Sequence, residues 1–327
     1  MNQPERLKPL KTWSHLAARR RRPSEYEIVS TNLHYTTDNP DAPFELDPNF
    51  PMAQWFKQNR NASPLKHDDW NAFRDPDEIV YRTYNMLQDG QETYVYGLLD
   101  QFSARGHDAM LERSWAVTLG RLYTPGRYLL HALQMGAAYL VQIAPASTIS
   151  NCAAYQSADT LRWLTHFAYR TKELSKTFAD IGLGVDERAH WERDPAWQGF
   201  RELVENALIA WDWGECFTAL NLVVRPAVEE TLLRGLGRIA RQNGDTLLGL
   251  LSDAQLIDVQ RHHRWAAALV KMALAQEGDA DVLSAWIAKW EPLADAAIDA
   301  YFAALNDPAG AAPAREATRA YRRGLGL

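Results

Sequence analysis

The feature that most constrains this chain is a helical spacing of apolar residues that begins after Asp75 and continues almost to the C-terminus. Apolar residues recur three and four positions apart, and no stretch alternates with a period of two for long enough to predict a sheet. A first helix is expected directly after Asp75, with Asp75 as its cap and Pro76 in its first turn. The spacing predicts further helices over residues 107–123, 125–143, 148–176, 195–211, 213–242, 245–276 and 280–305. The longest of them need partners along their whole length, which predicts an all-α fold built as a large antiparallel bundle.

The first 75 residues differ from the rest, because proline recurs through them with aromatic residues in between. Proline at this density prevents long helices, and a disordered tail would be poor in aromatic rings. We therefore expect an extended arm at residues 1–75, a helical bundle at 76–306, and a basic, small-residue tail at 307–327 that frays or docks at the edge. Aromatic and arginine side chains of the arm are the candidates for a partner interface: Trp13, Tyr35, Trp55, Arg60 and Trp70. Alternatively, the same rings fold back onto the chain's own bundle.

Charge and cysteine usage exclude several classes of protein. A formal net charge of -6 argues against binding to nucleic acid, and the arginines at residues 19–22 are typical of a solvated arm or a clamp for an acidic protein surface. Cys152 and Cys216 lie in apolar helical patterns, which indicates core packing and a reducing compartment. The most apolar stretch is interrupted by a histidine and two glutamines, so we expect a cytoplasmic protein that does not cross a membrane.

Two predicted helices carry near copies of a metal-binding motif. Ferritin-like di-iron bundles use one Glu from each of two helices and a Glu-x-x-His pair from each of two others. The copies here are "DTLRW" at residues 159–163 and "DVQRH" at residues 258–262. Thr160 and Trp163 stand where the first copy needs Glu and His, and Val259 stands where the second needs Glu, so His262 alone is left of the four ligands.

A cation takes the inward position on the helix predicted over residues 213–242. Arg225 would repel a metal ion there and could neutralise Asp159 or Asp258 instead. Pro226 should kink this helix unless a neighbour compensates for the missing backbone hydrogen bond. Asp-x-x-Arg also arises by chance on a charged helix face, so the motif by itself has a trivial explanation.

Four long segments carry a resemblance to a known family: residues 11–37, residues 54–92, "APASTISNCAAYQSADTLRWLTH" at 144–166 and "DWGECFTALNLVV" at 212–224. Together they resemble the beta subunit of toluene monooxygenase hydroxylases, among the bacterial multicomponent monooxygenases. The resemblance covers nearly the whole chain and implies a ferritin-like bundle that has lost its metal ligands. Thr160, Trp163, Arg225, Val259 and His262 would then be vestigial positions, with no catalytic, cofactor-binding or metal-binding residue in this chain.

The resemblance also implies partners. The family's alpha subunit holds the di-iron centre, and the hydroxylase is a dimer of alpha-beta-gamma units. An effector protein and a Rieske ferredoxin act on that complex, which uses NADH-derived electrons and O2 to hydroxylate aromatic hydrocarbons. The beta subunit would contribute a rigid wall and a dimer interface without chemistry of its own.

Two other functions stay open at this point. The chain could be an autonomous di-iron enzyme with unusual ligands such as His262, Glu173 and Glu187. The last of these belongs to an intact Glu-x-x-His at residues 187–190, which lies in a polar segment and is better explained as an exposed short helix. The chain could also be a binding protein that acts through its basic arm.

Overall fold

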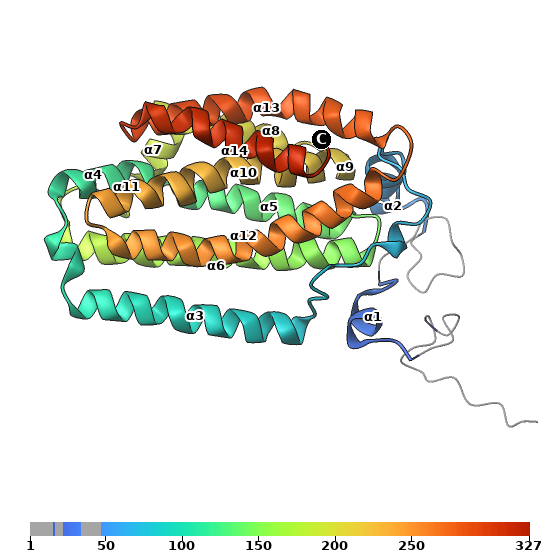
Figure 1. Cartoon of the computed structure of the whole chain (residues 1–327), viewed down its shortest axis with the longest axis horizontal. Helices are drawn as coiled ribbons and strands as arrows, with labels where there is room; N and C mark the ends of the chain where they lie inside the picture. The colour runs from blue at the N-terminus through green and yellow to red at the C-terminus, as the bar shows by residue number, and fades with distance from the viewer. Residues whose placement is uncertain (1–15, 17–21, 34–46) are drawn as a thin grey trace, which may run out of the picture.

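The computed structural model describes Leu16, residues 22–33 and residues 47–327. Within these ranges the chain is helical and contains no strand, which confirms the predicted all-α class. The longest helices lie side by side as an elongated bundle (Figure 1): α3 (Tyr81–Ala104), α5 (Gly126–Ile143), α6 (Ser147–Thr177), α12 (Thr246–Ala273) and α13 (Asp279–Ala304). The described residues contain no helix that is both long and apolar enough to span a membrane.

Shorter elements connect and cover these helices. They are α1 (Glu25–Ser30), α2 (Pro51–Phe56), η2 (Lys57–Asn61), η3 (Trp70–Ala72), η4 (His107–Met110), α4 (Arg113–Leu122), α7 (Glu187–Arg193), α8 (Pro195–Ala207), η7 (Pro308–Gly310) and α14 (Ala311–Gly324). The helix expected directly after Asp75 begins only at Tyr81. The Asp75 carboxylate instead accepts the backbone N–H groups of Asp77 and Ile79, so it caps a turn that precedes the helix.

One continuous rod spans the predicted 213–242 segment, with α turns and wider π turns alternating along it. Its parts are α9 (Trp213–Phe217), η5 (Thr218–Val224), α10 (Arg225–Val228), η6 (Glu229–Gly235) and α11 (Leu236–Gln242). Pro226 lacks an N–H, so the carbonyl of Leu222, four residues earlier, receives no α-helical bond from it. The guanidinium of Arg322 on α14 donates to that carbonyl at 3.2 Å. A neighbouring helix therefore supplies the hydrogen bond that Pro226 cannot donate, which is the condition under which no kink is expected from the sequence.

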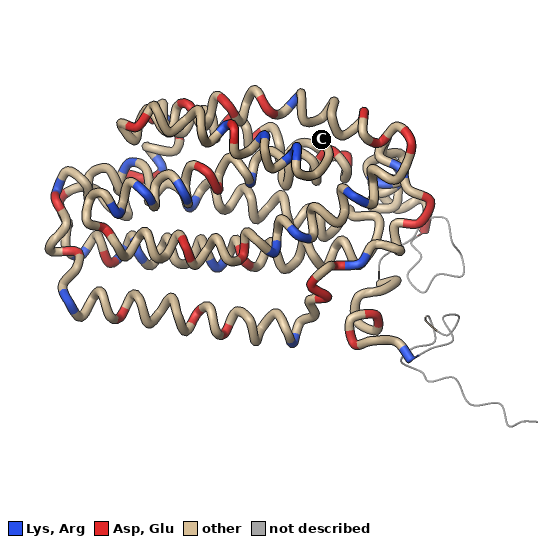
Figure 2. Tube along the Cα trace, viewed as in Figure 1, with Lys and Arg blue, Asp and Glu red and all other residues tan. Residues whose placement is uncertain are grey.

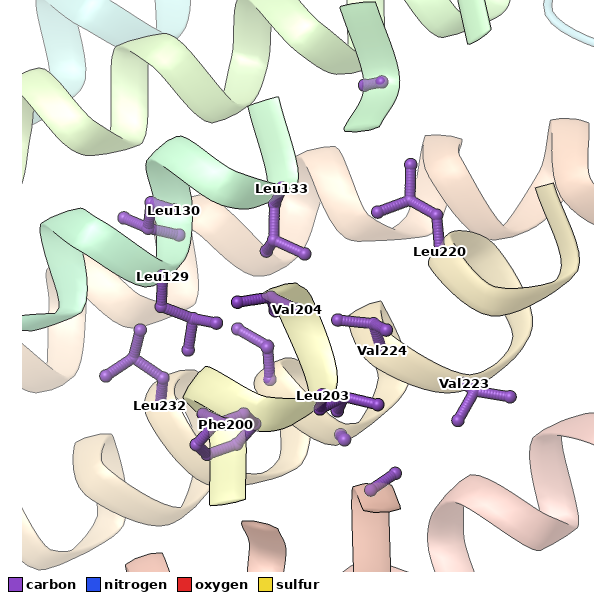
Figure 3. Close-up of a cluster of buried hydrophobic side chains, with 14 of the residues drawn as sticks. Leu129, Leu130, Leu133, Phe200, Leu203, Val204, Leu220, Val223, Val224 and Leu232 are labelled. Atoms are coloured by element: carbon purple, nitrogen blue, oxygen red, sulfur yellow. The ribbon is translucent and has the colours of Figure 1, made fainter. Parts of the chain in front are cut away.

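One part of the hydrophobic core lies between α5, α8 and the middle of this rod. Leu133 from α5, Val204 from α8 and Val224 from the rod point toward one another (Figure 3). Helices α8 and α13 approach each other closely at Gly199 of α8, where an added Cβ would lie 2.7 Å from the Cα of Ala297 on α13. Both cysteines are buried and free, so the prediction that they pack in the core is confirmed.

The last residues, expected to fray or dock at the edge, form α14, which docks on α13. The acidic residues Glu291, Asp295 and Asp299 follow one face of α13 at intervals of four. They pair with Arg315, Arg319 and Arg322 of α14. Arg322 is buried, so this end of the chain is held both by a ladder of ion pairs and by the carbonyl of the rod.

Candidate functional site

Two carboxylates are buried where α3, α6 and α12 meet. Asp159 of α6 is 0% exposed and Asp258 of α12 is 2% exposed. Unpaired buried carboxylates are very costly, so each must be neutralised by neighbouring charges or hydrogen bonds. We call Asp159 and Asp258 the buried carboxylate pair.

The two motif copies neutralise each other's aspartate. In the second copy, Arg261 forms an ion pair with Asp159, and His262 Nε2 lies 2.8 Å from the same carboxylate. In the first copy, Arg162 Nη1 and Trp163 Nε1 donate to Asp258 at 3.3 and 3.0 Å. Each copy thus supplies its arginine and the following residue to the aspartate of the other helix.

A third helix closes the cluster. The side-chain amide of Gln88 on α3 donates to Asp159 at 2.8 Å and to Asp258 at 3.0 Å, so it bridges the pair. Tyr84, one turn earlier, donates its hydroxyl to Asp159 at 2.9 Å. Glu92, one turn later, accepts from Arg162 and lies 3.0 Å from His166 Nε2. Three successive turns of α3 are therefore joined to α6 and α12 through polar contacts.

The protonation states follow from burial and from these contacts. Burial raises the pKa of Asp159, but the hydrogen bonds and charges of His262 and Arg261 outweigh it and hold that pKa below its usual range. Burial lowers the pKa of His262, and the charge of Arg225 lowers it further, against the opposing effect of Asp159. At neutral pH the cluster therefore contains an ionised aspartate beside a neutral imidazole.

Arg225 occupies the inward position that the sequence predicts, but it pairs with neither aspartate directly. It is 2% exposed, and its Nη2 donates to Thr160 Oγ1 at 2.8 Å. Burial lowers the pKa of Arg225 to about 10, which leaves it charged at neutral pH. The charges of Arg225 and Asp159 still favour each other, but the direct ion pairs to the two carboxylates come from Arg162 and Arg261 on the flanking helices.

The residues at the five positions that the sequence singles out do not fit a di-iron centre. Thr160 accepts a hydrogen bond from the buried cation Arg225, and Val259 offers no atom that could bind a metal. Trp163 and His262 lie with ring centroids 5.7 Å apart and are each directed at an aspartate. The cluster is thus a neutralised polar core whose chemistry is not that of a metal site.

The ligands considered for an autonomous metal enzyme do not form a shared site. Nowhere in the part of the chain that the structure describes do three or more His, Cys, Asp or Glu side chains gather to hold a metal ion. Glu187 lies on the short helix α7, as expected, but the expectation that it is exposed is wrong. Its carboxylate is buried and accepts the backbone N–H of Gly184. Glu173 lies on α6 beside Arg170.

Two of the partner-interface candidates, Trp55 and Trp70, contact the chain's own bundle, and a third, Arg60, contacts a ring within the predicted arm. Trp55 donates to the hydroxyl of Tyr139 at 3.0 Å and packs edge-on against Trp211. Trp70 packs edge-on against Trp213, and Arg60 is buried over the ring of Phe56. Trp13 and Tyr35 lie outside the described residues. The alternative that the arm's rings fold back thus applies to its second half, and the division into arm, bundle and tail stays a prediction.

Sequence reasoning missed Gln88, Tyr84 and Glu92. They recur every four residues on α3, which would place them on one helix face. The di-iron motif contains neither glutamine nor tyrosine, so this spacing was the signal that could have pointed to them.

An all-helical bundle of this kind places the chain in the ferritin-like class. The residues at its motif positions do not suit a di-iron centre. A family model described as methane/phenol/alkene hydroxylase matches residues 55–277. The match covers more than half of the chain, which therefore belongs to this hydroxylase family, and the resemblance noted in the sequence is confirmed.

Individual members of this family are also similar to the chain over most of its length. The beta subunit of the hydroxylase component of the toluene-4-monooxygenase system from Ectopseudomonas mendocina is 58% identical over 302 residues, or 92% of each chain. The phenol 2-monooxygenase oxygenase component DmpL of Pseudomonas sp. strain CF600 is 24% identical over 296 residues, which cover 85% of this chain and 80% of that one.

Two solved structures share the fold. Toluene 4-monooxygenase with toluene bound in its resting active site contains a chain that is 58% identical, with a TM-score of 0.87. The match covers 92% of this chain and 99% of that one. Xenon-pressurised phenol hydroxylase from Pseudomonas sp. OX1 matches with a TM-score of 0.82 over 100% of this chain and 98% of that one, and at 21% identity this likeness concerns the fold alone.

Proposed function

We propose that this chain is the non-catalytic beta subunit of the hydroxylase of an aromatic monooxygenase, such as one acting on toluene. The observation that carries the proposal is the neutralised core at the vestigial positions. A buried arginine donates to Thr160 where the resemblance implies a di-iron centre in a sister subunit. The 58% identity to a hydroxylase beta subunit over 92% of the chain supports the same assignment.

The proposed partners are an alpha subunit that holds the di-iron centre and a gamma subunit, in a dimer of alpha-beta-gamma units. The complex would receive NADH-derived electrons through a Rieske ferredoxin, with an effector protein, and would work in the cytoplasm. A bundle tied together by buried ion pairs is stiff, and a stiff neighbour helps to hold metal ligands in place. The arm would add contacts through Trp13 and Tyr35, with Trp55, Arg60 and Trp70 at its anchored end.

The test is to produce the chain alone and together with the large, Glu-x-x-His-containing subunit of its hydroxylase, and to measure iron in both preparations. We expect no stoichiometric iron in the isolated chain. The co-produced complex should hold iron and contain equal amounts of the two subunits. Stoichiometric iron together with hydroxylation by the isolated chain would instead support an autonomous di-iron enzyme.

A further inference from the structure

Helix α3 is anchored on one side only. Its inner face packs Val95, Leu98 and Leu99 against α12 and presents Gln88 to the buried carboxylate pair. Figure 1 shows α3 along one edge of the bundle, and no other described helix covers its far side. The outer face is therefore left uncovered by the described residues.

Large apolar side chains are exposed on that outer face, among polar ones. Met86, Leu87 and Tyr94 are 66%, 49% and 46% exposed. Figure 2 shows few charged residues along α3. Clustered exposure of large apolar side chains on one helix indicates an interaction surface, whereas single exposed ones are ordinary.

The spacing on this face matches the seam of two packed helices. Leu87, Gly90, Tyr94 and Gly97 follow one another at intervals of three, four and three, so large and small residues alternate along a heptad pattern. An added Cβ at Gly90 or Gly97 would meet nothing within 4 Å. These glycines do not serve packing inside the chain, and they leave hollows into which side chains of a facing helix can fit. We call this stretch the α3 seam.

Acidic residues border the α3 seam. Asp89 and Asp100 are exposed, and neither has an ion-pair partner among the described residues. They lie about 16 Å apart along the helix axis, on the same edge of the seam. Such an edge is complementary to basic side chains on the facing helix.

A second copy of this chain fits the seam poorly. If two copies packed antiparallel with Gly90 facing Gly97, Asp89 of each copy would come close to Asp100 of the other. Like charges at a helix interface oppose association. A different chain with a basic edge avoids this repulsion.

We propose that the α3 seam is the docking surface for a long helix of the hydroxylase's metal-binding subunit, and that this helix carries an apolar seam bordered by lysine or arginine. The inference rests on the proposed function and deepens it. Because the inner face of α3 supplies Gln88, Tyr84 and Glu92 to the polar cluster around the buried carboxylate pair, this docking would join the partner to that cluster through a single helix.

The test uses the wild-type chain co-produced with the large subunit as its reference. Gly90→Leu and Gly97→Leu should not unfold the free chain, since both sites are open and glycine is a poor helix former. We expect the double variant to bind the large subunit more weakly by on the order of tenfold, because the new side chains fill the hollows. Gly324→Leu, at an equally open glycine on α14, should bind like the wild type.

Charge reversal gives a second readout. Asp89→Lys with Asp100→Lys should slow association and flatten its dependence on salt, whereas Glu202→Lys on α8 should change neither. Wild-type affinity of the glycine double variant would overturn the proposal. Self-association of the free chain that the glycine substitutions abolish would assign the seam to a second copy. If removal of residues 1–21 strengthened binding to the large subunit, the α3 seam would be assigned to the chain's own arm.

The two proposals fail differently. If the wild-type chain does not form a complex with the large subunit at all, the proposed function is wrong. If the complex forms and the α3 variants leave it unchanged, only the docking surface is wrong.

Discussion

The residues around the buried carboxylate pair form a balanced set of charges. Asp159 and Asp258 face Arg162 and Arg261, and Gln88 bridges the two carboxylates. Removing one member of a buried ion pair typically costs about 3–5 kcal/mol, because the remaining charge is left without compensation. The set therefore acts as a unit, and restoring metal ligands one by one must disturb it.

Rebuilding the missing ligands should not restore metal binding while Arg225 remains. In a variant carrying Thr160→Glu, Trp163→His and Val259→Glu, the carboxylate at position 160 would pair with the guanidinium that now donates to Thr160 at 2.8 Å. We expect iron analysis to find no stoichiometric metal in the folded triple variant, and some metal once Arg225→Glu is added. Stoichiometric iron in the triple variant would mean that Arg225 does not block the site.

The depressed pKa of His262 predicts a loss of stability in mild acid. Burial lowers this pKa, so the unfolded chain takes up a proton below its ordinary pKa of about 6.5 while the folded chain does not. The contribution is fully present above that pH and declines as the pH falls from there. Because the pKa of Asp159 is also lowered, the chain loses further stability at lower pH, where the carboxylate of Asp159 becomes protonated.

Urea unfolding between about pH 7 and 5 measures this effect. His262→Gln should flatten the decline in the free energy of unfolding over that range. His131→Gln, at an exposed position, should keep the wild-type slope. An unchanged slope in the His262 variant would show that another group titrates.

At the scale of elements, α14 supplies the hydrogen bond that Pro226 removes from the rod. Proline inside a helix leaves the carbonyl four residues earlier without its donor, here that of Leu222. Arg322 supplies the donor from another helix and also pairs with Glu291. The rod can then carry Arg225 inward next to a proline without leaving a buried carbonyl unsatisfied.

A double-mutant cycle should detect this coupling. Arg322→Met should lower the free energy of unfolding by about 2 kcal/mol, since it removes a charged donor from a buried carbonyl. In a Pro226→Ala background the cost should be smaller, because alanine supplies the backbone N–H. Equal costs in both backgrounds would show that Arg322 stabilises the fold only through its ion pair.

At the scale of the whole molecule, the C-terminal helix closes the bundle. It covers one face of α13 and neutralises the acidic residues there, as the ladder of ion pairs shows. Without α14, three like charges would be left on one face of α13, and the rod would lose the donor at Leu222.

Truncation after Asn306 should therefore destabilise the chain far more than removal of a peripheral tail would. We expect a markedly lower midpoint of thermal unfolding, with part of the loss recovered in high salt, which screens the exposed acids. A truncated chain that unfolds at the wild-type temperature would show that α14 is dispensable.

Sequence alone determined the helical class, most of the long helices, and the identities of the residues at Thr160, Trp163, Arg225 and Val259. These are local properties, because helical spacing and side-chain chemistry can be read within a short window of residues. Tertiary structure decided which groups meet: each arginine with the aspartate of the other motif, Gln88 between the two, and Arg322 at Leu222. Those contacts join residues far apart in the chain, and they depend on how the helices are placed against one another, which spacing within one helix does not specify.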